Sequence, residues 1–384
     1  MTDVVVITGA SSGIGRATAL RFARAGACLV LASRRDTALQ QLAVECQLLG
    51  AEAVSFATDV TNPDAVDALA AEAVENFGKI DVWVNCAAVS VFASFETVPL
   101  EDFRRVIDVN VMGYVYGARS ALEVMTDQGH GVLINVASLV GEVPQPYTAA
   151  YCMSKAAVRA LGTSLRQELA LSKHKHIRVV TIMPPTVDTP FFRHAANYTG
   201  RAVVAMPPVY SAEHVAKAIT RAVRAPRAEI VVGATGKALV DRHRKHPRAI
   251  EAQMAAQTDR TQLSRKHHSV DTKGNLYIPA PNYDAEVDGG WKGRSRMPRS
   301  SGSGWLVIGL VGGVLAAVTL LGDSGDRGKK SRRGRRSRQA VTAVALSVRS
   351  ADAAKMIARS KRNLKKARRS VKKHARAVSR QAAA

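Results

Sequence analysis

Near its beginning the chain reads VVVITGASSGIG over residues 4–15, and this stretch decides the fold. Val4 to Ile7 form an apolar run of the length expected for a buried parallel strand. A glycine-rich turn follows, and a helical pattern then runs to Ala25, where Gly26 ends it. Glycines between a strand and a helix let backbone N–H groups approach a phosphate, whose charge the helix N-terminus favours. The stretch therefore predicts a strand–turn–helix unit that binds a dinucleotide.

Apolar strand patterns alternate with amphipathic helical patterns over about 235 residues. Such alternation implies a parallel sheet that is covered by helices on both faces. We therefore predict an α/β fold, a Rossmann-like doubly wound parallel sheet of about seven strands, in one catalytic domain over residues 1–240. After the first strand, the others are expected near residues 28–32, 52–57, 81–85, 131–136, 177–183 and 229–232.

Three residues with fixed spacing indicate the chemistry. Tyr151 and Lys155 are four residues apart and share one face of a helix, and Ser138 precedes Tyr151 by thirteen positions. A neighbouring ammonium favours the phenolate, so we expect Lys155 to lower the pKa of Tyr151. Ser138 can hydrogen-bond a carbonyl or alcohol while Tyr151 gives or takes its proton. A lone Y-x-x-x-K pair is common by chance as an exposed helical pair, but here a dinucleotide turn accompanies it.

The turn has the pattern T-G-x-x-x-G-x-G, and with Ser138, Tyr151 and Lys155 it makes the chain resemble the short-chain dehydrogenase/reductase family. The resemblance covers about residues 1–235 and implies an oxidoreductase that interconverts an alcohol and a ketone or aldehyde by hydride transfer. Asn110 matches the family's helical asparagine, which holds a water in a proton relay to the lysine. The resemblance also implies a homodimer or homotetramer. The implied catalytic residues are Asn110, Ser138, Tyr151 and Lys155.

The resemblance also implies a set of cofactor-binding residues, with two departures from the family pattern. Asn85-Cys86-Ala87-Ala88 stands for Asn-Asn-Ala-Gly, and Pro185 replaces a glycine in the loop beside the nicotinamide, which stiffens the loop and removes an N–H. The implied residues are Gly9, Ser11, Ser12, Gly13, Ile14, Gly15, Ser33, Arg34, Arg35, Asp59, Val60, Asn85, Ala87, Tyr151, Lys155, Pro184, Val187 and Thr189.

The end of the second strand favours one cofactor. An acidic residue there would accept hydrogen bonds from the ribose hydroxyls and repel a 2′-phosphate. The chain instead reads Ser33-Arg34-Arg35, with no carboxylate before Asp36, and a guanidinium suits phosphate. NADP(H) is therefore preferred, with NAD(H) as the other cofactor; the alternative is that both arginines are merely solvated at a helix start.

Two further features bear on the site and its compartment. Phe191-Phe192 begins a segment that we interpret as a substrate lid, although ordinary core packing explains the two aromatics equally well. The four cysteines, at positions 28, 46, 86 and 152, lack metal-ligand spacing, and we predict no metal site. No pattern typical of a cleavable signal peptide precedes Val4, so we expect reduced thiols and a cytoplasmic catalytic domain.

The composition changes after residue 240. Residues 241–304 form a polar extension or linker, and residues 305–321 carry no charge. A helix of that length spans only about 25 Å against a hydrocarbon core of about 30 Å. We interpret residues 305–321 as a membrane segment that crosses the bilayer or lies in its plane; a buried helix docked on the enzyme is the alternative.

Residues 322–384 form a basic tail, which we expect to be disordered or an amphipathic helix. Residues 327–384 hold 21 of the 55 basic side chains and one of the 31 acidic ones, so this part carries most of the net charge of +24. Such a run suits an anionic membrane surface, and binding to nucleic-acid phosphates or simple solvation are the alternatives. We expect a membrane-associated enzyme acting on a small alcohol or carbonyl substrate, plausibly apolar. The competing hypothesis is a reductase-like scaffold whose tail binds anionic lipid or nucleic acid.

Overall fold

The computed structural model describes residues 3–279 and 285–291. Its strands are β1 (Val4–Thr8), β2 (Cys28–Ser33), β3 (Glu52–Ala57), β4 (Val82–Asn85), β5 (Val91–Phe92), β6 (Gly131–Val136), β7 (Ile177–Met183), β8 (Val187–Asp188), β9 (Ala196–Asn197), β10 (Arg201–Val203), β11 (Tyr210–Ser211), β12 (Glu229–Val231) and β13 (Leu263–His268). Its helices are α1 (Gly13–Ala23), α2 (Asp36–Leu48), α3 (Pro63–Phe77), α4 (Leu100–Ile107), α5 (Gly113–Gln128), α6 (Ala149–Leu171), α7 (Phe191–His194), α8 (Ala212–Arg224), α9 (Ala234–Lys245) and α10 (Pro247–Gln257). Short π- and 3₁₀-helical turns lie at Asp108–Met112, Leu139–Gly141 and Thr258–Gln262.

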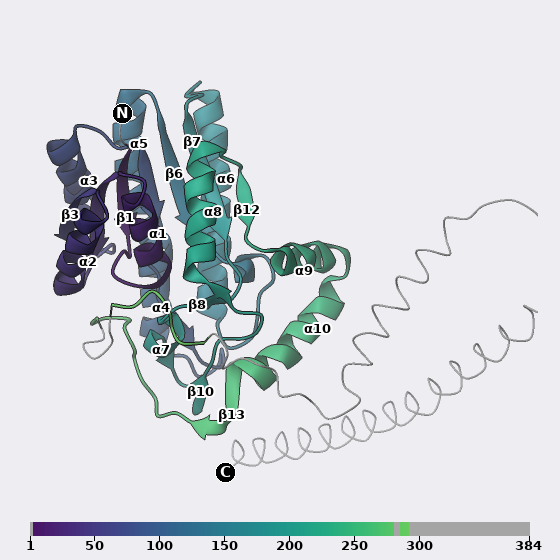
Figure 1. Ribbon diagram of the computed structural model, residues 1–384. Coiled ribbons are helices and arrows are strands. Elements are labelled where there is room, and N and C mark those ends of the chain that lie inside the picture. The colour runs from purple at the N-terminus through teal and green to yellow at the C-terminus, as the bar shows by residue number, and fades with distance from the viewer. Residues whose placement is uncertain (1–2, 280–284, 292–384) are drawn as a thin grey trace, which may run out of the picture. The chain divides into compact units, whose positions relative to one another are not determined.

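One seven-stranded sheet with the order β12-β7-β6-β4-β1-β2-β3 organises the domain (Figure 1). All of its neighbouring strands pair in parallel. The order reverses between β2 and β4, which both flank β1, as it does in a doubly wound sheet. The predicted fold class and all seven predicted strands are confirmed.

Helices cover both faces of the sheet because its strands are apolar on both sides. Along β1, Val5 and Ile7 pack in one core with α1, α2 and α8, whereas Val6 packs in the opposite core with α3 and α5. Successive side chains of a strand point to opposite faces, so a continuous apolar run requires cover on both. This burial fixes the carboxyl ends of the strands as the edge where loops gather.

The chain continues as ordered structure beyond residue 240. The helices α9 and α10 pack on each other, and β13 pairs antiparallel with β10. The described residues 241–279 belong to the same compact unit as the seven-stranded sheet, so folded structure continues past residue 240. A few buried apolar residues, among them Val240, Ile250 and Met254, hold this otherwise polar region together with its hydrogen bonds.

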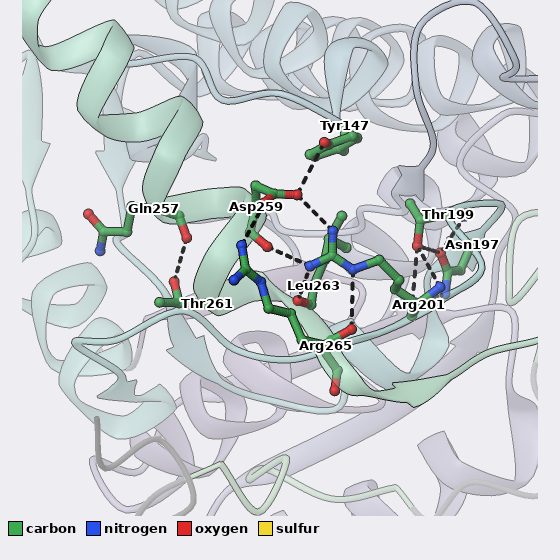
Figure 2. A network of polar contacts seen from close by, with 10 residues as sticks. Tyr147, Asn197, Thr199, Arg201, Gln257, Asp259, Thr261, Leu263 and Arg265 are labelled. Carbon is green, nitrogen blue, oxygen red and sulfur yellow. Dashed lines mark hydrogen bonds and ion pairs between the residues drawn. The ribbon is translucent and has the colours of Figure 1, made fainter. Parts of the chain in front are cut away.

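Arg201 on β10 shows how this late part of the chain is held (Figure 2). Its guanidinium donates to the Asp259 carboxylate at 2.7 Å and to the backbone carbonyls of Asp259 and Leu263, each at 2.6 Å. Tyr147 donates to the same carboxylate at 3.4 Å. One side chain thus connects β10, the turn before β13 and the loop that precedes α6.

No helix within residues 3–279 and 285–291 is long and apolar enough to cross a membrane. The predicted membrane segment at 305–321 and the basic tail at 322–384 lie outside the described residues.

Candidate active site

The loops at the carboxyl ends of β1, β2, β6 and β7 bring the predicted site residues together. In a doubly wound sheet, ligands bind at this edge, near the point where the strand order reverses. Figure 1 shows α4, α7 and β8 gathered at this end, with the green C-terminal segment running past them.

The glycine-rich turn between β1 and α1 has no room for side chains. A Cβ on Gly15 would lie 2.2 Å from the Gly9 carbonyl oxygen, and Gly9 and Gly13 have φ values of +69° and +55°. The Ser12 side chain makes no capping hydrogen bond at the start of α1. The turn therefore presents backbone N–H groups at a helix N-terminus, which fits the pyrophosphate of a dinucleotide. Ile14 follows at the start of α1, partly buried against the core.

The end of β2 places two partly buried arginines beside this turn. Arg35 donates to Ser11, both to the hydroxyl and to the carbonyl oxygen at 3.3 Å, and its backbone N–H donates to Ser33. Arg34 donates to three backbone carbonyls, those of Asn275, Leu276 and Tyr277, at 2.6, 3.2 and 2.9 Å. The alternative of two merely solvated arginines is therefore wrong. The three carbonyls that Arg34 contacts belong to residues 275–277. No motif in this polar stretch predicted that it lies at the site.

Ser138, Tyr151 and Lys155 meet as their spacing predicts. Ser138 follows β6 and hydrogen-bonds Tyr151, which lies on α6 one turn before Lys155. The Lys155 ammonium lies 5.6 Å from the centre of the Tyr151 ring. The two hydroxyls can therefore contact the same substrate oxygen, with the lysine behind them.

Tyr114 on α5 is a member of this cluster that the sequence analysis missed. Its hydroxyl accepts a hydrogen bond from the Lys155 ammonium at 3.1 Å and donates to the Val136 carbonyl at 2.9 Å. Lys155 also donates to Val136 O at 2.9 Å. Tyr114 lies four residues after Asn110, so its helical spacing from a predicted site residue was the available signal.

Burial sets the charges in the cluster and corrects one expectation. It lowers the pKa of Lys155 to about 7 from an ordinary 10.5. It also raises the pKa of the Tyr151 phenol above 10.0, and the hydrogen bond with Ser138 only partly opposes this. The expected lowering of the Tyr151 pKa is therefore not found, because desolvation of the phenolate outweighs the hydrogen bond with Ser138.

Asn110 lies in the π-helical turn between α4 and α5 and is fully buried. Its amide exchanges hydrogen bonds of 2.9 Å with the backbone N–H and C=O of Val89, and it donates to Ser154 on α6 at 3.0 Å. π-Helical turns within α-helices are frequent at functional sites. The side chain thus connects the loop after β4 to α6, one residue before Lys155.

Two predicted cofactor residues have inward roles. The Asn85 side chain is 1% exposed, accepts from Trp83 Nε1 at 2.8 Å and donates to Asn135 on β6 at 3.0 Å. Val60 is buried in the core that covers β4. Both side chains point into the protein: Asn85 pairs with its neighbours in the sheet, and Val60 packs in the apolar core.

Asp59 contacts α4, and Ala87 contacts the glycine turn. Asp59 forms an ion pair with Arg105 on α4 at 3.0 Å. The Ala87 backbone closes on the glycine turn: a Cβ on Gly9 would lie 2.7 Å from the Ala87 Cα, and Ala87 N–H donates to Thr8 at 3.4 Å. This contact explains why Gly9 tolerates no side chain.

The loop after β7 also lies beside the glycine turn. The Pro184 carbonyl accepts a hydrogen bond from Leu139 N–H at 2.9 Å, and Val187 belongs to β8. Thr189 lies against Gly13: a Cβ added to Gly13 would lie 3.1 Å from the Thr189 Cβ. Trp291 donates from its indole to Thr189 O at 3.0 Å.

Aromatic rings that are buried or partly buried extend from Tyr151 into the predicted lid. The centres of the Tyr151 and Phe191 rings are 5.3 Å apart, those of Phe191 and Phe192 are 5.5 Å apart, and those of Phe192 and Trp291 are 6.0 Å apart. Such offset and edge-to-face pairs are favourable. The first turn of the predicted lid is therefore in contact with the catalytic cluster.

The geometry agrees with similarity to known proteins. Residues 3–198 match the family model of the short chain dehydrogenases. The chain is 34% identical over 308 residues to the uncharacterized oxidoreductase YxnA of Bacillus subtilis, covering 79% of this chain and 82% of that protein. It is 32% identical over 247 residues to the putative oxidoreductase SadH of Mycobacterium tuberculosis, covering 62% of this chain and 88% of that protein.

Two solved structures are similar in fold and sequence. A short chain dehydrogenase/reductase from Burkholderia phymatum in complex with NAD matches with a TM-score of 0.60 and 28% identity, over 65% of this chain and 95% of that chain. An alcohol dehydrogenase from the archaeon Thermococcus sibiricus complexed with 5-hydroxy-NADP matches with a TM-score of 0.53 and 28% identity, over 60% of this chain and 96% of that chain. The fold, the residues of the site and these similarities together show that the chain is an oxidoreductase that belongs to the short-chain dehydrogenase family.

Proposed function

We propose that this oxidoreductase interconverts a small alcohol and the corresponding ketone or aldehyde, with Tyr151 as general acid in reduction and general base in oxidation. The contact between the Ser138 and Tyr151 hydroxyls, backed by buried Lys155, carries the proposal. Two hydroxyl groups at one point suit a single substrate oxygen whose charge changes during reaction.

A bound nicotinamide supplies or accepts the hydride, and the residues of the chain handle the oxygen and its proton. Ser138 donates a hydrogen bond to the carbonyl oxygen and orients it. Tyr151 transfers its proton to that oxygen as the carbonyl carbon is reduced, and the tyrosine is left as a phenolate. Lys155, fixed by Tyr114 and Val136, supplies the positive charge that stabilises this phenolate. Phe191 covers the ring of Tyr151 and limits the access of water.

Replacing Tyr151 with phenylalanine tests this assignment. Tyr151→Phe should retain cofactor binding and lose turnover by several orders of magnitude, because orientation and proton transfer act as a unit. Screening the purified protein for NADPH oxidation against ketones and aldehydes, including apolar ones, supplies the assay. Tyr210→Phe is the matched control, since its hydroxyl contacts Thr235 rather than the cluster. Near-normal turnover in Tyr151→Phe would remove the proposal.

We further propose a preference for NADP(H) over NAD(H). The support is the position of Arg34 and Arg35 at the end of β2, beside the glycine turn, with Arg35 already in contact with Ser11. Guanidinium groups bind phosphate well, and no carboxylate stands before Asp36 to accept ribose hydroxyls.

The ratio of the dissociation constants for NADPH and NADH measures this preference. Arg35→Asp should lower the preference for NADPH by at least about 10-fold, because one lost ion pair with a phosphate is worth about 1.4 kcal/mol or more. Arg34→Asp tests the second guanidinium, and exposed Arg119 on α5 offers a matched Arg→Asp control. A ratio that stays constant in both variants would place the specificity elsewhere.

We also propose that the enzyme associates with membranes. The support is the uncharged run at 305–321 followed by the basic tail. Stable anchoring generally needs two signals, and these segments supply an apolar and an electrostatic one. The catalytic domain would then remain cytoplasmic, and the substrate would be an apolar alcohol or ketone taken from the lipid phase.

A further inference from the structure

Residues 285–291, which we call the covering segment, contact the glycine turn and the Asp188–Thr189 loop. We call the region between this turn and this loop the groove, and the proposed function assigns it to the cofactor. The first contact of the covering segment is with the glycine turn: the Glu286 carbonyl oxygen accepts a hydrogen bond of 2.9 Å from Gly13 N–H. Gly13 is the first residue of α1, where backbone N–H groups and the helix dipole favour an anion. The covering segment therefore supplies an acceptor oxygen where a pyrophosphate oxygen is expected.

The other end of the covering segment is fixed to the loop beside the expected nicotinamide. The Asp188 carboxylate accepts from Gly289 N–H at 2.9 Å and from Trp291 N–H at 2.8 Å, and the Trp291 indole donates to Thr189 O. Trp291 is 8% exposed and packs edge-to-face on Phe192. A Cβ on Gly289 would lie 2.1 Å from Thr189 O, so the backbone itself is pressed against this loop.

The residues that lead into the covering segment are held by a separate set of contacts. Leu276 is fully buried in the core that covers β4, and its carbonyl accepts from both Arg34 and Arg105. Tyr277 donates to buried Asp102 on α4 at 2.9 Å. In contrast, Glu286 and Asp288 are exposed, and the ion pair between Glu286 and Arg193 spans 3.4 Å at the surface. Exposed pairs of this kind contribute little. The chain is thus anchored at 276–277 by contacts away from the glycine turn, whereas residues 285–291 are held at Gly13, Asp188 and Thr189.

We propose that the covering segment is an intramolecular competitor of the dinucleotide, so that the cofactor must displace residues 285–291 from Gly13 and from the Asp188–Thr189 loop. This inference rests on the proposed function, because it assumes that the groove binds NADP(H) or NAD(H). One N–H cannot donate a full hydrogen bond to Glu286 O and to a phosphate oxygen at the same time. The anchor at 276–277 keeps its place, since Leu276 is fully buried in the core and Tyr277 donates to buried Asp102 rather than lying over the turn.

Competition of this kind lowers the apparent affinity by the fraction of molecules in which the segment is undocked. Weakening the docking should therefore tighten the binding of both cofactors by the same factor. The factor is the same because the covering segment contacts the pyrophosphate and nicotinamide ends of the groove, which NADPH and NADH share. Arg34, at the end where they differ, is held by residues 275–277 instead.

Calorimetric titration of the full chain with NADPH and NADH tests the competition. Trp291→Ala weakens docking of the covering segment, and Asp288→Ala, at an exposed position in the same segment, is the control. If a tenth of the wild-type molecules are undocked, Trp291→Ala should lower both dissociation constants by up to ~10-fold, and the control should leave them unchanged. Unchanged or raised dissociation constants in Trp291→Ala would overturn the proposal.

Hydrogen exchange on the wild-type protein gives a second test that does not depend on how the variant folds. Saturating NADPH should speed exchange of the Gly289 and Trp291 amides while leaving exchange around Leu276 unchanged. Slower or unchanged exchange at residues 285–291 would show that the segment closes over the cofactor or ignores it, and would overturn competition while the proposed function stands. Failure of wild type and Trp291→Ala alike to bind either cofactor would instead remove the proposed function, and this inference with it.

Discussion

At the scale of single residues, the main electrostatic feature of the site is that burial lowers the pKa of Lys155. An ammonium that is 1% exposed, with one hydroxyl and one carbonyl as hydrogen-bond acceptors, loses most of its hydration. Within the described part of the chain, the one Coulombic interaction that raises the pKa of Lys155 is with Cys86. Burial in turn raises the pKa of Cys86 to about 12. The charge of Lys155 is therefore adjustable near neutral pH, and a phosphate-bearing ligand placed nearby would favour its charged form.

This burial predicts a pH dependence of stability. The unfolded chain keeps Lys155 protonated up to a pKa near 10.5, whereas the folded chain releases the proton near pH 7. Between these values the unfolded state binds more protons, so the free energy of unfolding contributed by Lys155 rises with pH. Thermal unfolding of the ligand-free protein should show a Tm that increases from pH 7 to pH 9 relative to Lys155→Met. Parallel Tm curves for the two proteins would contradict this.

At the scale of elements, the late hairpin-like pairing of β10 with β13 depends on one guanidinium. Arg201 reaches across from β10 to Asp259, Leu263 and Ser264, and these residues surround the start of β13. Its ion pair with Asp259 lowers the pKa of that carboxyl, chiefly through their hydrogen bond. Leu263 in turn packs with Phe92 and Ala195 beside Phe192. The β10–β13 pair thus contacts the predicted lid through Leu263 and Phe192.

Replacing Arg201 with methionine should separate this pair from the domain. The change leaves three backbone carbonyls without this donor and removes the ion pair with Asp259, and hydrogen bonds to charged groups contribute roughly 2 kcal/mol. We expect Tm to fall by about 5 °C. We also expect KM for the substrate to rise with little change in kcat, because the lid loses support while the catalytic cluster is intact. Arg119→Met is the exposed control, and an equal loss of stability there would refute the role of the network.

At the scale of the whole molecule, charge and chemistry are separated along the chain. Residues 1–299 form one compact unit, which contains every predicted catalytic and cofactor residue. Most of the net charge of +24 lies beyond residue 326, after the uncharged run at 305–321. A basic balance confined to one end bears on where a protein binds rather than on how it folds.

Vesicle sedimentation tests the membrane proposal. The full chain should pellet with vesicles that contain phosphatidylserine, and high salt should weaken only the electrostatic part, because salt screens charge and leaves apolar insertion intact. A chain that ends at Arg299 should stay in the supernatant with its reductase activity. If the full chain stays in solution and instead co-purifies with nucleic acid in a salt-dependent way, the tail binds phosphate and the membrane proposal falls.

Periodic and local patterns were enough to predict the sheet and the meeting of Ser138, Tyr151 and Lys155. The alternation of apolar runs specifies buried parallel strands, and the four-residue spacing of Tyr151 and Lys155 specifies one helix face, because both signals arise within a few residues of the chain. The glycines at positions 9, 13 and 15 likewise act through local backbone geometry and close contacts.

Only the tertiary structure decided which groups complete the site. Arg34 bonds carbonyls more than 240 residues away at Asn275 and Tyr277, and Gly13 meets Glu286 across an even longer separation. Backbone carbonyls and N–H groups are the same at every residue, so such contacts leave no signature in the sequence. The pKa of Tyr151 also depended on burial, which packing creates and spacing does not reveal. The sequence thus determined which side chains meet at the site, whereas long-range packing determined the pKa shifts of these side chains and which segment lies over the glycine turn.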